Sequence, residues 1–137
     1  MTSTVVVDGA SLTCAAVTAV ADIRRFAAPA ALGGAVLSRG VEEHAGFATQ
    51  SARATSDAVA AYRAVLACEL ISATRALRLQ ARVPGGALRQ AFDLADSALE
   101  QAAADRPLDS DLGAAQAALL GIAAVVAWPG AGPVAIG

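Results

Sequence analysis

The chain has 137 residues, of which 56% are hydrophobic and 16% charged, a balance that excludes an intrinsically disordered protein and suits one domain. Ten arginines, no lysine and twelve acids give a net charge of −2, which argues against a nucleic-acid-binding protein that relies on a positive field. Alanine supplies 38 residues and the aromatic residues only five, so the core cannot be filled with bulky side chains, although helices can approach closely.

The N-terminal segment predicts a short strand followed by a helix. Residues 4–7 form a β-branched Thr-Val-Val-Val run, which Asp8-Gly9 closes with a turn. Thr13 is the expected N-cap of a helix that runs to about Arg25, with apolar residues at helical spacing. The next segment, residues 27–40, contains one proline and three glycines and is expected to be a linker.

The longest helical candidate is the segment 41–82, which contains no proline and one glycine, Gly46. Such a helix is about 60 Å long. Most of its faces carry apolar or small side chains, and one stripe contains Val59, Tyr62, Leu66, Leu70, Ala73 and Leu77. A helix of this kind is normally buried on most faces, and the rest of the chain is too small to wrap it. We therefore predict an all-α, elongated, oligomeric bundle of long helices from several chains.

Two shorter helices are expected after the Pro-Gly-Gly break at 84–86. The first covers residues 87–104, and the second runs from Ser110 to about Trp128 with Asp109 as its cap. The last 26 residues carry no charged side chain. A membrane-spanning helix is the alternative there, but the apolar segment is short, rich in alanine and without flanking positive charge, so we expect burial between subunits and no membrane contact.

These elements are assigned to a single domain that spans the whole chain. Its parts are the N-terminal strand and helix at 1–26, the linker at 27–40, the helical bundle region at 41–128 and a tail at 129–137.

The two cysteines and the single histidine do not form a metal-binding pattern. Cys14 and Cys68 are far apart and lack ligand spacing, so no metal site is expected. Each thiol is expected to act as a small apolar residue in a reducing compartment. Because the first residues also lack a basic start and an apolar run, we expect a cytoplasmic protein.

The one dense polar cluster is Glu42-Glu43-His44, at the start of the long helical candidate. Two acids at a helix start complement its dipole, and this structural role needs no activity. In the functional interpretation, one carboxylate acts as a base or pairs with a substrate ammonium, and burial among apolar subunits raises its pKa towards the useful range.

Other polar residues of the long segment are expected to have structural roles. Arg53, Arg75 and Arg78 are expected to form interhelical or surface ion pairs. Glu69 is expected to be a buried, hydrogen-bonded acid, and Tyr62 a core or interface residue.

Several ordered motifs resemble the histidine and aromatic amino acid ammonia-lyases. The family's E-[DE]-H, T-x-x-A-R and V-L-A-x-E-L segments appear here as residues 42–44, 49–53 and 65–70. Its D-R-P-L-x-x-D element appears as residues 105–111, and the opening residues 5–21 resemble its first strand and helix. Together these motifs cover most of the chain.

The departures from this family are equally specific. The family is several times longer, and this chain resembles its beginning joined to its end. The family's electrophilic methylidene-imidazolone group forms from an Ala-Ser-Gly tripeptide, which does not occur here, since Ala10-Ser11 is followed by Leu12. The family's catalytic tyrosine loop and its carboxylate-binding arginine are missing too. Ala45-Gly46 replaces the Val-Ser that follows the family's histidine.

The resemblance therefore implies a chain that cannot eliminate ammonia from an amino acid by itself. It implies a small subunit of a heteromeric lyase or aminomutase, in which a larger lyase-like chain supplies the methylidene-imidazolone group. Glu42 then enters a composite site near the substrate amine, with Glu43 and His44 in support. The alternative is a non-catalytic helical scaffold or assembly protein, which associates with copies of itself or stabilises a partner. A third, weaker interpretation is a new activity in the space left by the missing middle.

Overall fold

The computed structural model describes residues 9–33, 47–102 and 106–126, and within these ranges every regular element is a helix. The elements are α1 (Gly9–Phe26), a short 3-10 helix η1 (Ala30–Gly33), α2 (Ala48–Leu79), α3 (Ala87–Ala98) and α4 (Asp109–Val125). The predicted all-α class is confirmed. The strand expected at residues 4–7 and the tail at 129–137 lie outside the described residues.

The first helix begins earlier than predicted. Gly9, the expected turn residue, is the first residue of α1, and Thr13 lies inside the helix, so the assignment of Thr13 as its N-cap was wrong. The reason is tertiary packing: Leu12 is only 7% exposed and belongs to the core shared with α2. Burial of this side chain stabilises a helical first turn, which local capping preferences alone do not predict.

The long helix is shorter than predicted because its N-terminal end is interrupted. Phe47, immediately before α2, has φ 42° and ψ 25°, which is left-handed backbone, so a helix cannot run uninterrupted from Val41 to Arg82. The first helical residues are instead joined to Phe47 through a hydrogen bond from the Ser51 N–H to the Phe47 carbonyl. With 32 residues, α2 is about 48 Å long.

At its other end, α2 closes in a Schellman motif. The Arg82 N–H donates to the Leu77 carbonyl at 3.0 Å, and the Ala81 N–H donates to the Arg78 carbonyl at 3.0 Å. Ala81 has φ 49°, in the region where glycine is the favoured residue of this motif.

Replacement of Ala81 by glycine is expected to stabilise the protein by about 0.5–1 kcal/mol. Relief of the left-handed alanine gains about 1–2 kcal/mol, and the greater freedom of glycine in the unfolded chain takes back part of it. Ala76→Gly is the matched control, because Ala76 is an exposed residue inside α2 where glycine costs about 1 kcal/mol. Thermal unfolding of both variants at one protein concentration measures the difference, and equal destabilisation by the two glycines would contradict the expectation.

The third helix ends earlier than predicted. It was expected to reach residue 104, but it ends at Ala98, and Leu99 has extended backbone with φ −95° and ψ 144°. Leu99 is 3% exposed and belongs to the core. The extended backbone at Leu99 ends the helix and brings the Leu99 side chain into the core. Burial of this leucine offsets the loss of further helical hydrogen bonds.

The fourth helix also departs from its predicted cap. Asp109 is its first helical residue, the N-cap is Leu108, and no side chain caps the end, so the assignment of Asp109 as the cap was wrong. Leu108 is 3% exposed in the core, and burial there selects an apolar residue over a capping one. None of the helices that the structure describes combines the length and the apolar character needed to cross a membrane.

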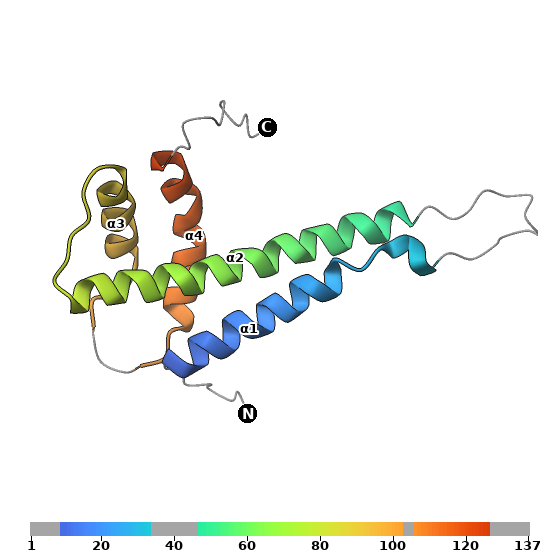
Figure 1. The fold of residues 1–137 in the computed structure, drawn as a ribbon, viewed down its shortest axis with the longest axis horizontal. Helices are drawn as coiled ribbons and strands as arrows, with labels where there is room; N and C mark the ends of the chain where they lie inside the picture. The colour runs from blue at the N-terminus through green and yellow to red at the C-terminus, as the bar shows by residue number, and fades with distance from the viewer. Residues whose placement is uncertain (1–8, 34–46, 103–105, 127–137) are drawn as a thin grey trace, which may run out of the picture.

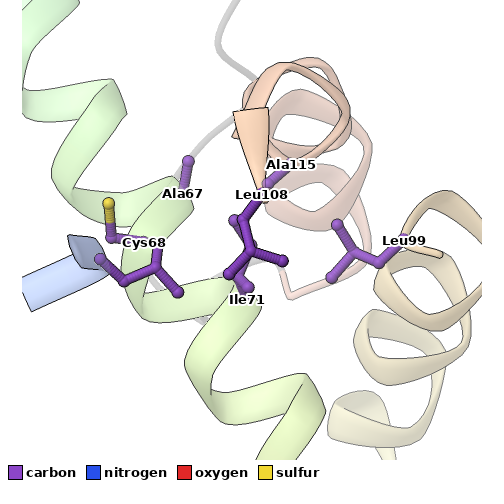
Figure 2. Close-up of a cluster of buried hydrophobic side chains, with 7 residues drawn as sticks. Ala67, Cys68, Ile71, Leu99, Leu108 and Ala115 are labelled. Atoms are coloured by element: carbon purple, nitrogen blue, oxygen red, sulfur yellow. The ribbon is translucent and has the colours of Figure 1, made fainter. Parts of the chain in front are cut away.

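The helices form an elongated arrangement around α2 (Figure 1). The helix α1 runs antiparallel along α2, α4 crosses α2, and α3 lies beside α4. Where the helices meet, a small core forms from Leu12, Ala67, Cys68, Ile71, Leu99, Leu108 and Ala115. Figure 2 labels all of these residues except Leu12. Ala67 and Ala115 are both 0% exposed, so short side chains allow α2 and α4 to pack closely.

The core occupies only the C-terminal half of α2. The buried residues of α2 are Ala67, Cys68, Ile71 and Thr74. The predicted apolar stripe lies beside them and is open to solvent at its start, because Val59 is 54% exposed and Tyr62 56% exposed. The described part of the chain therefore leaves the N-terminal half of its longest helix largely uncovered. Its assembly into a multi-chain bundle stays a prediction.

Candidate functional site

The sequence-predicted site residues Glu42, Glu43 and His44 lie outside the described residues. What the structure describes is the helix that follows them. The family-like segment 49–53 forms the first turns of α2, and all five of its side chains are exposed, including Arg53. The start of α2 therefore presents a polar, uncovered surface next to the predicted site in the sequence.

The next family-like segment, residues 65–70, has a mainly structural role. Ala67 and Cys68 are buried in the core, whereas Glu69 points outward and is exposed. The prediction that Glu69 is a buried structural acid was wrong for the single chain, because its side chain projects away from the α2 stripe that packs on α4.

The third family-like motif, at residues 106–111, forms a buried ion-pair cluster. The Arg106 Nη2 donates to the Asp111 Oδ2 at 2.7 Å, and the Arg106 Nη1 lies 3.3 Å from the Glu100 Oε2. The side chain of Asp111 is 4% exposed and that of Arg106 15%. The second Asp111 oxygen accepts the Glu100 backbone N–H at 3.4 Å. This cluster joins the start of α4 to the segment after α3.

Asp111 is also well placed in electrostatic terms, because it lies in the first turn of α4, where a carboxylate is stabilised by the helix dipole. The motif was recognised in the sequence, but its structural role was not. The spacing from arginine to aspartate across one helix start was the available signal.

A second arginine holds the end of α3 against α2. The Arg78 Nε donates to the Asp96 Oδ1 at 2.6 Å, and its two terminal nitrogens donate to the carbonyls of Asp96, Leu99 and Glu100 at 2.8–3.3 Å. Carbonyls at a helix C-terminus lack donors within the helix. The Arg78 guanidinium provides hydrogen-bond donors to them. The predicted ion-pair role of Arg78 is confirmed.

A small hollow of about 110 Å³ lies beside Arg78, lined by Arg75, Arg78, Leu79, Gln101 and Ala102. Most of the donors of the Arg78 guanidinium are already used by α3, and the Gln101 side-chain amide donates to the Asp96 carbonyl at 2.7 Å. Two of the polar side chains of this hollow, those of Arg78 and Gln101, therefore serve the helix end.

The two thiols differ in their surroundings. Cys14 is exposed and Cys68 is buried, and both are free. Burial raises the pKa of the Cys68 thiol, a backbone hydrogen bond acts against this, and the Glu69 carboxylate raises the pKa further. A raised pKa disfavours the reactive thiolate, so Cys68 serves as the small apolar core residue that was predicted, whereas Cys14 does not have a core position.

Within the described ranges, no three side chains of the metal-ligating types come together. The prosthetic group that the resemblance implies requires Ala-Ser-Gly as its precursor, and this sequence has no such tripeptide. The residues present therefore do not fit formation of that group in this chain.

Comparison with known proteins assigns the relationship. The chain matches the family model described as aromatic amino acid lyase over residues 5–97, which is more than half of its length. This match confirms the resemblance that the motifs indicated. No curated protein and no solved structure gives a significant match.

Proposed function

The chain belongs to the aromatic amino acid lyase family, and from this premise we propose that it is the small subunit of a heteromeric ammonia-lyase or aminomutase. In this proposal a larger lyase-like chain carries the methylidene-imidazolone group, and this chain completes the active site in trans. The substrate class is an aromatic α-amino acid.

The observation that carries the proposal is that the N-terminal half of α2, a helix within the family match, is largely exposed in the described part of the chain. The first buried residue of α2 is Ala67, although the helix begins at Ala48. Apolar side chains before it, such as Val59 and Tyr62, are more than half exposed. Burial of apolar area is worth about 25 cal/mol per Å², so a second chain that covers this half of α2 gains free energy. Such a chain would lie next to the residues that precede α2.

The proposed chemistry rests on Glu42. By resemblance to the family, its carboxylate lies near the substrate amine, and Glu43 and His44 support it through hydrogen bonds. Burial between apolar subunits would raise the pKa of a carboxyl group, which makes it a better proton acceptor near neutral pH. The sequence provides no other cluster of this kind.

The alternative function is a non-catalytic scaffold or assembly protein derived from the lyase fold. One observation favours it: two largely buried arginines, Arg78 and Arg106, both bind groups at helix ends. These polar networks stabilise the arrangement of α2, α3 and α4, which is the role of a scaffold.

The two functions are separated by an activity assay on the assembled complex. This chain is co-expressed with a lyase-like chain of the same genome that carries Ala-Ser-Gly and lacks its own Glu-Glu-His helix. Release of cinnamate-type products from aromatic amino acids is followed by absorbance. Activity is expected only with both chains present.

Glu42→Gln is expected to reduce kcat at least about 100-fold, the usual contribution of a positioned acid or base, without loss of the complex. Asp57→Asn is the matched control, because Asp57 is an exposed acid on α2, and it should leave kcat unchanged. Full activity of the larger chain alone would remove the subunit proposal. Activity that requires this chain but tolerates Glu42→Gln would assign the scaffold function.

A further inference from the structure

A continuous groove runs between α1 and α2 along their outer surface. Its larger hollow, of about 410 Å³, is lined by Ala16, Val17, Val20, Arg24, Val65 and Glu69 among others. A second hollow of about 340 Å³ shares Ala16 and Glu69 with the first and extends it towards Leu12 and Ser72. We call these two hollows together the α1/α2 groove.

The floor of the α1/α2 groove is apolar and accessible. Val17 is 64% exposed, and Val20 and Val65 line the same hollow. This row of valines is exposed at Val17 and half-buried at Val20 and Val65. Such a surface between two antiparallel helices is of the kind that a further helix or helix pair covers in a bundle.

The two charged residues of the groove, Arg24 and Glu69, are separated along it. Glu69 shares both hollows with Ala16, whereas Arg24 is eight residues further along α1, which is about 12 Å at 1.5 Å per residue. Both side chains are exposed, and among the described residues neither forms an ion pair. The groove therefore has one positive and one negative position, with valines between them.

We propose that the α1/α2 groove is a self-association surface, on which a second copy of this chain seats its own α1 and α2 about a two-fold axis near Val20. Such an axis exchanges the positions of Arg24 and Glu69 along the groove, so Arg24 of each copy meets Glu69 of the other, and the valines pack at the centre. This is an isologous contact in which one patch is complementary to itself.

The charges also determine the orientation. If the second copy lay in the same direction along the groove, Arg24 would face Arg24 and Glu69 would face Glu69, and like charges across an interface disfavour that arrangement. The reversed copy has two attractive pairs and gives a four-helix arrangement of two antiparallel pairs. This inference goes beyond the proposed function, because it concerns the chain alone and needs no larger lyase-like partner.

Sedimentation equilibrium of the full-length chain tests the apolar centre of the contact. The wild type is expected to have twice the 13.5 kDa mass of one chain, and Val17→Asp is expected to have the mass of one. Leu120→Asp is the matched control, since Leu120 is a 63% exposed leucine on α4, and it should keep the wild-type mass. A wild type that stays monomeric, or that associates only with a larger chain, would overturn the proposal.

A charge exchange tests the orientation with variants at exposed positions. Arg24→Glu and Glu69→Arg alone should each raise the dimer Kd about tenfold, because each places like charges together at two symmetric positions. The double variant should return the Kd to within about twofold of the wild type. Arg53→Glu, an exposed arginine elsewhere on α2, should leave the Kd unchanged. Circular dichroism identifies any variant that fails to fold, and failure of the double variant to restore association, with the fold intact, would overturn the two-fold arrangement.

Discussion

Replacement of Asp111 by alanine is expected to lower the free energy of unfolding by about 3 kcal/mol. Its carboxylate is 4% exposed and pairs at 2.7 Å with Arg106, which is itself largely buried. Its removal leaves Arg106 with only the half-exposed Glu100 carboxylate, at 3.3 Å, as a charge partner, and it takes the acceptor from the Glu100 backbone N–H. Breaking a buried pair in this way costs about 3–5 kcal/mol in other proteins. The loss should be read from urea unfolding at a fixed protein concentration, because association would otherwise change the apparent stability.

Two further variants separate the buried pair from charge pairs in general. Arg89→Ala breaks the 2.9 Å pair with Asp93, whose side chains are more than half exposed, so it should cost less than about 1 kcal/mol. The double variant Arg106→Met/Asp111→Leu should recover most of the loss, since apolar replacement of both partners avoids a buried lone charge. The explanation would be contradicted if Asp111→Ala cost no more than Arg89→Ala.

Replacement of Ile71 by alanine is expected to destabilise the protein by about 3 kcal/mol. Ile71 is 0% exposed, and it is the largest fully buried side chain among the described residues. Loss of its methyl and methylene groups removes apolar burial and leaves a cavity, which together cost about 2–5 kcal/mol in protein cores. The small side chains around it, such as Ala67 and Ala115, cannot fill the space.

Leu79→Ala provides the comparison for Ile71→Ala. Leu79 lies on the same helix but is 78% exposed, so its truncation should change the free energy of unfolding by less than about 0.5 kcal/mol. The same urea titration measures both variants. Similar losses at the two positions would show that the core is not centred on Ile71.

The helical architecture was predictable because it depends on local signals. The Pro-Gly-Gly break at 84–86 separates α2 from α3, and long segments without proline predicted the helices on both sides. The helix ends were less predictable, because tertiary burial determines them. Leu12 is buried in the core near the start of α1, and Leu99 is buried at the end of α3. Capping rules predict different positions for these two helix ends.

The location of the core was also only partly predictable. The sequence indicated the stripe of bulky apolar residues on α2 as a buried face. In the structure, the buried residues lie on the neighbouring stripe, with Ala67, Ile71 and Thr74. In an alanine-rich chain, close approach of helix backbones favours small residues, and no hydrophobic periodicity identifies which small residues these are.

The candidate site, unlike the helices, could not be predicted from local signals. Glu42, Glu43 and His44 were identified by motif and family resemblance, and the match over residues 5–97 confirms the family but not their roles. The D-R-P-L-x-x-D motif shows why a motif alone does not define a function. In the structure, Arg106 and Asp111 stabilise a helix start.

We propose that this chain functions as one part of a two-component lyase-family assembly. Native mass spectrometry of the chain co-purified with the larger, Ala-Ser-Gly-containing chain tests it most directly. We expect a single complex that contains both chains in a fixed ratio, from which this chain does not dissociate at low micromolar concentration. Two separate species, each made of one kind of chain, would contradict it.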